Sequence, residues 1–377
     1  DHPLDLAEIM PVLERMGLRV QAEVGHPIRI AAHEGATDAI VYVHDLAIER
    51  PAGQKRLDAR FEKAFEAIWA RETENDRFNG LVVALGTDWR SAALLRTLCR
   101  YRSQSGLDPS EQVQIRALAE HAGISNNLLK LFAIKFDPAS AADIPARRQA
   151  AAPVIGEIEK QLESVATLDA DRALRRLLAL VKSLQRTNYY LQDAEGKPWR
   201  HIAVKIASRE ADPLPAPRPY REIFVWSPDV EGVHLRFGPV ARGGLRWSDR
   251  REDFRTEVLG LVKAQMVKNT VIVPVGSKGG FFAKRSPVGG DRDAARDVGL
   301  RLTLRRLTLR WLSLRRRGFG RRVLSSRVLS WLPLRLTRRL GSALPRRRLA
   351  ATSLIGNRLR RSLTVTLCRS YRRSRSH

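Results

Sequence analysis

The sequence predicts an α+β fold in which a helical scaffold is followed by a mixed β-sheet. Between residues 56 and 186, apolar side chains recur at helical spacing in several segments. After residue 200 the pattern changes to short β-prone runs separated by proline and glycine. Residues 301–377 match neither pattern, because they consist mainly of arginine, leucine and serine. The predicted fold is therefore confined to the residues before this tail.

The N-terminal residues are typical of the end of a small α/β domain. Residues 4–16 have apolar side chains at helical spacing, and Gly17 ends that pattern. Residues 18–24 and 39–46 have the alternation of strands. We therefore expect residues 1–52 to be the end of a regulatory-type domain. Since the chain begins with aspartate and not methionine, we also expect it to be part of a longer protein.

Residues 53–186 are predicted to form a helical scaffold. Leu94 and Leu98 line one face of a predicted helix, and Cys99 lies on the same face. A cysteine at such a position is expected to be a small core residue and not a nucleophile. The stretch 137–153, rich in alanine and proline, is predicted to be a loop between helices.

Residues 187–296 are predicted to begin a second domain built on a sheet. The runs 201–208 and 221–227 are predicted strands, separated by the proline-rich linker 214–219. Residues 233–237 alternate and are predicted to form a further strand.

A helix and a buried strand are predicted next along the chain. Asp249 and Glu252 form a capping pair for a helix over residues 251–269. Residues 270–275 are a continuous apolar run, which is typical of a strand buried on both faces.

Of three candidate anion-binding residues, Arg242 precedes this helix and Lys268 lies in its last turn. Arg242 precedes the pair Gly243 and Gly244, where the backbone must turn or approach something closely. On such a loop a guanidinium can bind a carboxylate through two parallel hydrogen bonds. Lys268 falls in the last turn of the predicted helix. The helix dipole also favours a cation at that position, so a purely structural role stays open.

The third candidate, Lys278, lies in a predicted glycine turn formed by residues 276–280. A lysine on such a turn can face a cleft while its neighbours exclude water. Burial and the nearby cation Lys268 would favour the neutral amine, which suits a residue that exchanges a proton near neutral pH. A surface turn is the alternative. A phosphate-binding loop is excluded, because Ile272 and Ser277 occupy positions where that motif requires glycine.

Charge is unevenly distributed along the chain. The formal net charge is +27, from 67 basic and 40 acidic residues. Residues 301–377 contain 23 arginines and no lysine, aspartate or glutamate, which leaves 44 basic and 40 acidic residues in 1–300. This near-neutral balance is typical of a cytoplasmic protein and does not indicate a nucleic-acid binder.

Cysteine, histidine and hydropathy patterns exclude further classes of protein. Cys99 and Cys368 are the only cysteines, which excludes a disulfide framework and a thiolate metal site. The eight histidines show no paired spacing typical of metal ligands, so no metal is expected. No uncharged apolar run reaches the length of a membrane span, so no membrane association is expected.

The block from residue 229 to 285, together with residues 186–198 and 214–228, resembles the large bacterial NAD-specific glutamate dehydrogenases. The resemblance covers about residues 1–296 and is strongest over 186–290. It implies oxidative deamination of L-glutamate to 2-oxoglutarate and ammonia with NAD, in a cytoplasmic homo-oligomer.

The resemblance also implies roles for the candidate residues. By position, Arg242 with Gly243 and Gly244 matches the loop that holds a substrate carboxylate, although smaller relatives carry lysine at the position of Arg242. Lys268 matches a second substrate-binding lysine, and Lys278 matches the catalytic lysine. In the implied mechanism, the neutral lysine helps water attack the iminium left by hydride transfer. The resulting carbinolamine then loses ammonia.

The resemblance fades between residues 291 and 299, and residues 297–377 are expected to be disordered or non-native. Three interpretations of this tail compete: a basic arm for nucleic acid, a membrane-surface helix and the product of a shifted reading frame. Arginine recurs on every face, which disfavours the membrane helix. We favour the frameshift, because GC-rich codons read out of register yield arginine, leucine, serine and proline.

The sequence contains neither a Pro-Ala-x-Asp block nor a G-x-G-x-x-G fingerprint after a strand. NAD is therefore implied by the resemblance alone, and no cofactor-binding residue is identified. The chain by itself is expected to be inactive. The alternative function is a non-enzymatic binding protein that uses residues 301–377 to bind nucleic acid.

Overall fold

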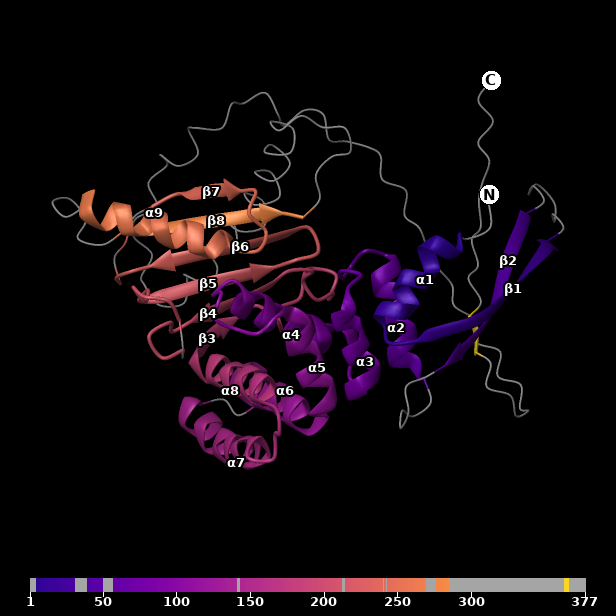
Figure 1. Cartoon of the computed structure of the whole chain (residues 1–377), viewed down its shortest axis with the longest axis horizontal. Coiled ribbons are helices and arrows are strands. Elements are labelled where there is room, and N and C mark those ends of the chain that lie inside the picture. The colour runs from indigo at the N-terminus through magenta and orange to yellow at the C-terminus, as the bar shows by residue number, and fades with distance from the viewer. Residues whose placement is uncertain are drawn as a thin grey trace, which may run out of the picture. The chain divides into compact units, whose positions relative to one another are not determined.

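A computed structural model describes residues 5–30, 39–49, 57–140, 143–211, 214–239, 241, 243–268, 276–284 and 363–365 (Figure 1). The chain divides into two compact units. Residues 1–10, 18–50 and 315–377 belong to the first unit, and residues 11–17 and 51–314 belong to the second. Helix α1 (Leu6–Arg15) spans the division and confirms the helix predicted over 4–16.

The first unit is built on a long antiparallel hairpin. Strand β1 (Arg19–Ile30) pairs with β2 (Ala39–Glu49), and both strands extend beyond the predicted ones. Strand β9 (Leu363–Val365) pairs with the other edge of β2. Apart from β9, the tail of residues 297–377 lies outside the described residues. The prediction that this tail is disordered or non-native therefore concerns residues that the structure does not describe.

The second unit begins with the predicted helices. Aspartates cap several of them: Asp58, Asp88 and Asp143 each accept a hydrogen bond from a backbone N–H in the first turn, which satisfies donors that the helix itself cannot. The elements are α2 (Ala59–Trp69), the 3-10 helix η1 (Arg77–Asn79), α3 (Gly80–Leu85), α4 (Trp89–Ser103), α5 (Glu111–Glu120), α6 (Ala122–Phe136), α7 (Ile144–Leu162) and α8 (Leu168–Ser183).

Helix α7 corrects part of the loop predicted over 137–153. Residues 144–153 are helical, whereas residues 137–140 do lie between α6 and α7. Alanine has the highest helix propensity of all residues, and this stretch is rich in it. Pro145 lies in the first turn, where its missing N–H has no helical partner to lose, and Asp143 caps the same turn. Pro153 is accommodated inside the helix. Proline was therefore a misleading indication of a loop at positions 145 and 153.

Cys99 lies in α4 and its side chain is fully buried, which confirms its prediction as a core residue. Burial raises the pKa of its thiol above the ordinary value, so the thiolate that a nucleophile requires is disfavoured.

A six-stranded sheet with the order β3-β4-β5-β6-β8-β7 follows the helices (Figure 1). All neighbouring strands are antiparallel except β7 and β8, which are parallel. The strands predicted over 201–208, 221–227 and 233–237 are confirmed. The strands are β3 (Leu184–Thr187), β4 (Ile202–Ile206), β5 (Arg221–Trp226), β6 (Val230–Arg236), β7 (Leu245–Ser248) and β8 (Ser277–Ala283).

The parallel pair β7 and β8 is joined through helix α9 (Phe254–Lys268), which confirms the helix predicted over 251–269. Figure 1 shows α9 across the sheet, and Val258 of this helix lies against Gly280 of β8. Because β7 and β8 are parallel, the chain must return along α9 before β8 can start. The end of α9 and the starts of β7 and β8 therefore lie at the same edge of the sheet.

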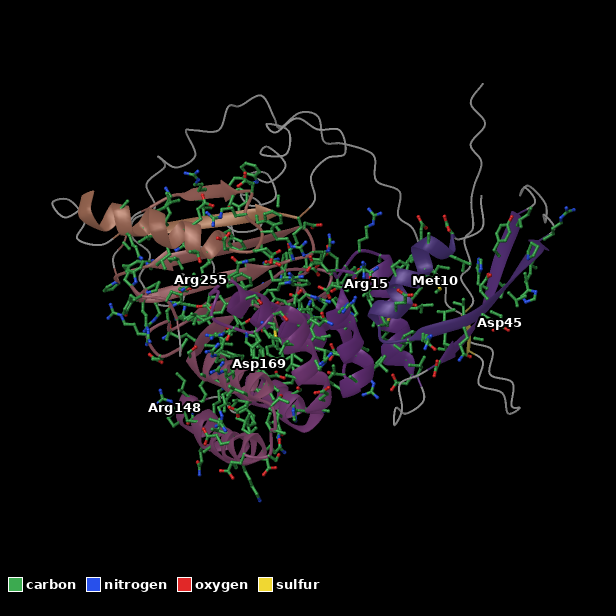
Figure 2. All side chains as sticks on the ribbon, viewed as in Figure 1. Met10, Arg15, Asp45, Arg148, Asp169 and Arg255 are labelled. Atoms are coloured by element: carbon green, nitrogen blue, oxygen red, sulfur yellow. The ribbon has the colours of Figure 1, made fainter. Side chains whose placement is uncertain are left out.

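The start of α9 is fixed by a buried ion pair. Arg255, labelled in Figure 2, donates to Glu222 of β5 at 2.9 Å through Nε and at 2.7 Å through Nη2. Tyr101 of α4 donates its hydroxyl to the same carboxylate at 3.0 Å. All three side chains are fully buried. One carboxylate thus holds together the sheet, α9 and the helical scaffold.

A second polar cluster lies at the other end of β5 and β6. Lys284 contacts Glu74 at 2.9 Å and Glu231 of β6 at 2.6 Å. The indole N–H of Trp226, in β5, donates to the same Glu74 at 2.9 Å. Glu231 also lies 3.9 Å from Arg100 of α4. These contacts tie the sheet to the scaffold a second time.

We expect Glu222→Ala to lower the free energy of unfolding by about 3–5 kcal/mol, because it leaves the guanidinium of Arg255 buried without its counter-charge. Urea unfolding of the 377-residue chain measures the loss. Glu252→Ala is the control, since Glu252 is highly exposed and its ion pair with Arg251 contributes little. Equal effects of the two substitutions would contradict the proposed importance of the buried pair.

Candidate functional site

The glycine loop before β7 runs directly beside the start of β8. The backbone N–H of Gly279 donates to the carbonyl of Gly244 at 3.0 Å, and the N–H of Phe237 donates to Gly276 at 3.3 Å. A Cβ atom at Gly243 would collide with the carbonyl oxygen of Ser277. Glycine at position 243 therefore permits the close approach that the sequence pattern predicted.

Lys278 lies in strand β8 and not in the predicted glycine turn. It pairs with Leu235 of β6, and its side chain is half-buried. The neighbouring glycines serve packing instead of a turn. A Cβ at Gly279 would collide with Leu245 and come within 3.0 Å of His234, and one at Gly280 would collide with Val258.

The alternation of β8 places Lys278 on the face covered by α9. Side chains two residues apart in a strand share a face, so Lys278 lies on the same side of the sheet as Gly280, whose position faces Val258 of α9. Lys268 is the last residue of α9, and this end of the helix reaches the edge where β8 starts. The side chain of Lys268 and the whole of Arg242 lie outside the described residues, as does the strand predicted over 270–275.

The topology nevertheless brings the backbone positions of the predicted site together. Gly243 and Gly244 precede β7, Lys268 ends α9, and Lys278 is the second residue of β8. All three segments meet at one edge of the sheet, because α9 connects two parallel strands. Basic residues at such an edge are suited to binding a small molecule that carries carboxylates. Of the three predicted basic residues, only Lys278 has a described side chain here.

His234 lies in β6 on the opposite face of the sheet, next to Gly279. Burial lowers the pKa of His234 to about 3, and the charge of Arg236 contributes in the same direction. The imidazole is therefore neutral at physiological pH and adds no charge beside the start of β8.

The ion pair of Glu222 and Arg255 is not among the residues that the sequence pattern predicted for the site. The alternation of β5 contained an indication of this pair, because Glu222 shares a face with the buried Phe224 and Trp226. An acidic residue on an otherwise apolar face requires a buried partner. Arg255 supplies that partner from a helix 33 residues further along the chain.

Comparison with known proteins gives three matches to sequence models of protein families. Residues 1–60 match "Glutamate dehydrogenase, ACT3 domain", and residues 73–138 match "Glutamate dehydrogenase, helical motif 3". Residues 157–308 match "Bacterial NAD-glutamate dehydrogenase, catalytic domain".

Three proteins named NAD-specific glutamate dehydrogenase are similar in sequence. The protein of Halomonas elongata is 42% identical over 309 residues, that of Pseudomonas aeruginosa 44% over 300 residues, and that of Mycobacterium tuberculosis 42% over 311 residues. These alignments cover 78–79% of the chain. They cover only 18–19% of the length of the relatives.

All of these descriptions name one class of protein, the glutamate dehydrogenases. More narrowly, the chain belongs to the family of large bacterial NAD-specific glutamate dehydrogenases, of which it spans about a fifth. Within the described residues, none of the helices has the length and apolar character required to cross a membrane.

Gly243→Ala should destabilise the junction between the glycine loop and β8 by about 1–3 kcal/mol, because the added methyl group cannot fit beside Ser277. Gly244→Ala is the matched control, since a Cβ at Gly244 meets no atom within 4 Å. Hydrogen exchange at residues 276–280 measures the effect locally. If both variants exchange like the wild type, the close approach is not a feature of the protein in solution.

Acid should destabilise the fold partly through His234. Its pKa is about 3 in the folded state and about 6.5 in the unfolded state, so the unfolded state binds more protons between these values. Stability is then lost as the pH falls from 6.5 towards 3, by at most about 1.4 kcal/mol per pH unit from this group. His234→Gln should show a shallower loss between pH 7 and pH 4 in urea unfolding. Identical slopes for the two proteins would argue against a buried neutral imidazole.

Proposed function

We propose that this chain supplies the substrate-binding edge of an enzyme that deaminates L-glutamate oxidatively, with NAD as the oxidant and with 2-oxoglutarate and ammonia as products. The observation that carries the proposal is the meeting of the Gly243–Gly244 loop, the end of α9 and Lys278 at one edge of the sheet. The names of the relatives support the reaction and the cofactor.

L-Glutamate carries two carboxylates and one amino group. The proposed site supplies Arg242 and Lys268 as cations for binding and Lys278 as the amine that acts at the carbon bearing the amino group. Arg242, on the glycine loop, binds one carboxylate through its guanidinium fork. Lys268, at the end of α9, binds the substrate as a second cation. Gly243 and Gly244 allow the loop to approach β8 closely enough for these groups to act on one molecule.

Lys278 is the proposed catalytic residue. Oxidation of the substrate leaves an iminium at the α-carbon, and the free amine of Lys278 accepts a proton from the water that attacks this carbon. The protonated Lys278 returns its proton to the nitrogen of the resulting carbinolamine. The C–N bond then breaks to release ammonia, and the hydroxyl group passes its proton to the amine of Lys278 and becomes the keto group of 2-oxoglutarate. The position of Lys278 on the face covered by α9, at the edge that the Gly243–Gly244 loop and the end of α9 also reach, supports this role.

The part of the chain that the structure describes shows no glycine-rich loop between a strand and a following helix of the kind that seats a dinucleotide. Gly243 and Gly244 precede strand β7, whereas the glycines of a dinucleotide loop follow a strand and lead into a helix. The described residues therefore do not fit NAD.

The remaining expectations become parts of the same proposal. Residues 1–52 form the end of a regulatory-type domain, residues 53–186 a helical scaffold, and residues 187–296 the beginning of the catalytic domain. The family matches over 1–60, 73–138 and 157–308 support this division in outline. A cytoplasmic homo-oligomer remains a prediction. Nucleic-acid binding through residues 301–377 has no support from the relatives, all of which are named dehydrogenases.

Steady-state kinetics test the assignment in a full-length dehydrogenase that carries this segment. Lys278→Ala should lower kcat for L-glutamate by about 10²–10⁴-fold, because it removes the general base. Lys268→Ala should mainly raise KM, because it removes a substrate contact. Lys263→Ala, which removes an exposed lysine from the same helix, is the control. Full activity of the Lys278→Ala enzyme would rule out the proposed catalytic role.

A further inference from the structure

Helix α9 is tied to the edge strand β7 by the carboxylate of Glu257, which lies in the first turn of the helix. Oε2 of Glu257 accepts a hydrogen bond from the hydroxyl of Ser248 at 2.6 Å. Oε1 of the same carboxylate lies 3.3 Å from Nε of Arg246. Arg246 and Ser248 both belong to β7. We call these three residues the β7 clamp.

The register of the sheet explains why both residues of β7 reach the helix. Arg246 pairs with Gly280 of β8, and a Cβ atom at Gly280 would collide with Val258 of α9. Residues paired directly across neighbouring strands have their side chains on the same face, so Arg246 lies on the face covered by α9. Ser248 lies two residues further along β7 and therefore shares this face. The first turn of α9 places Glu257 within reach of both.

The two contacts of Glu257 differ in strength. Ser248 is buried and the side chain of Glu257 is only 19% exposed, so their hydrogen bond is largely removed from water. A hydrogen bond to an ionised group is about twice as strong as one between neutral groups. The side chain of Arg246 is 57% exposed, and an ion pair of such a residue contributes little. The bond from Ser248 is therefore the main contact of the clamp.

Strand β7 depends on this contact more than β8 does. β7 has four residues and ends the strand order of the sheet, so within the described residues β8 is its one neighbouring strand. β8 lies between β6 and β7 and pairs with β6 over seven residues. Lys278 of β8 pairs with Leu235 of β6, so its position does not require β7. The loop of Gly243 and Gly244 leads directly into β7 and moves with it.

We propose that Glu257 is a positioning residue for substrate binding, because the β7 clamp fixes the glycine loop next to Arg242. Arg242 precedes Gly243 in the sequence, so a shift of β7 displaces it. The inference rests on the proposed function, in which Arg242 binds a carboxylate of L-glutamate. Loss of the clamp weakens binding of the substrate and leaves the chemistry at Lys278 intact. The signature of this role is a raised KM with kcat nearly unchanged.

Steady-state kinetics of a full-length dehydrogenase that carries this segment test the proposal. Glu257→Ala should raise KM for L-glutamate about tenfold and change kcat by less than about threefold. A merely structural role predicts a different result, because a smaller folded fraction lowers the apparent kcat and leaves KM unchanged. Glu252→Ala is the control, since Glu252 is a highly exposed carboxylate close to the start of the same helix.

Two further variants cover the case in which Glu257→Ala does not fold. Glu257→Gln keeps an oxygen that accepts the hydrogen bond of Ser248, so its KM should stay within about threefold of the wild type. Ser248→Ala removes that bond but keeps the carboxylate, and it should raise KM nearly as much as Glu257→Ala. A wild-type KM for Ser248→Ala, or a lowered kcat with an unchanged KM for Glu257→Ala, would overturn the proposal.

Hydrogen exchange on the 377-residue chain separates failure of this inference from failure of the proposed function. Glu257→Ala should speed exchange in residues 243–248 and leave β5 and β6 unchanged, whatever the reaction is. Unchanged exchange in residues 243–248 would show that the clamp does not hold β7. Faster exchange there, together with full activity of Lys278→Ala, would confirm the clamp but refute its assigned role in substrate binding.

Discussion

The buried ion pair between Glu222 and Arg255 is the interaction on which the arrangement of the second unit depends. Both side chains are fully removed from solvent, and the same carboxylate accepts the hydroxyl of Tyr101. Such a pair contributes little net stability, because desolvation offsets most of the attraction between the charges. The pair instead fixes the orientation of the elements that carry the two side chains. A guanidinium fork and a carboxylate fit in few geometries, so this pair sets where α9 begins relative to β5 and α4.

The direction of α9 in turn determines which residues meet at the edge of the sheet. A helix that joins two parallel strands must end where the second strand begins, so Lys268 and Lys278 are brought towards the Gly243–Gly244 loop by connectivity alone. Glycines then allow the elements to come close, because side chains at positions 243, 279 and 280 would collide with their neighbours. The ion pair, the crossover and the glycines together account for the geometry of the candidate site.

Local pattern was sufficient to predict the strands around residues 202–206 and 221–226 and the helices before residue 186, because their periodicity is encoded in neighbouring residues. Local pattern failed where a contact with a distant part of the chain determines the local structure. The glycines beside Lys278 suggested a turn, but they belong to a strand packed against Val258 and Leu245. The pairing of Glu222 with Arg255 could not be located, since only the fold brings distant positions together. In α7, alanine propensity and an N-terminal cap outweighed proline.

The placement of Arg221 and Glu222 on opposite faces of the sheet also bears on how the strands find their alignment during folding. If β5 slipped by one residue, Arg221 would enter the apolar interior beside α4 and Glu222 would turn towards the face opposite α9. The slipped strand would bury an arginine without Glu222 beside it and leave Arg255 without its carboxylate. Misaligned pairings are thus penalised twice, by lost apolar contacts and by charges placed on the wrong side. The sheet therefore carries an electrostatic check on its own register.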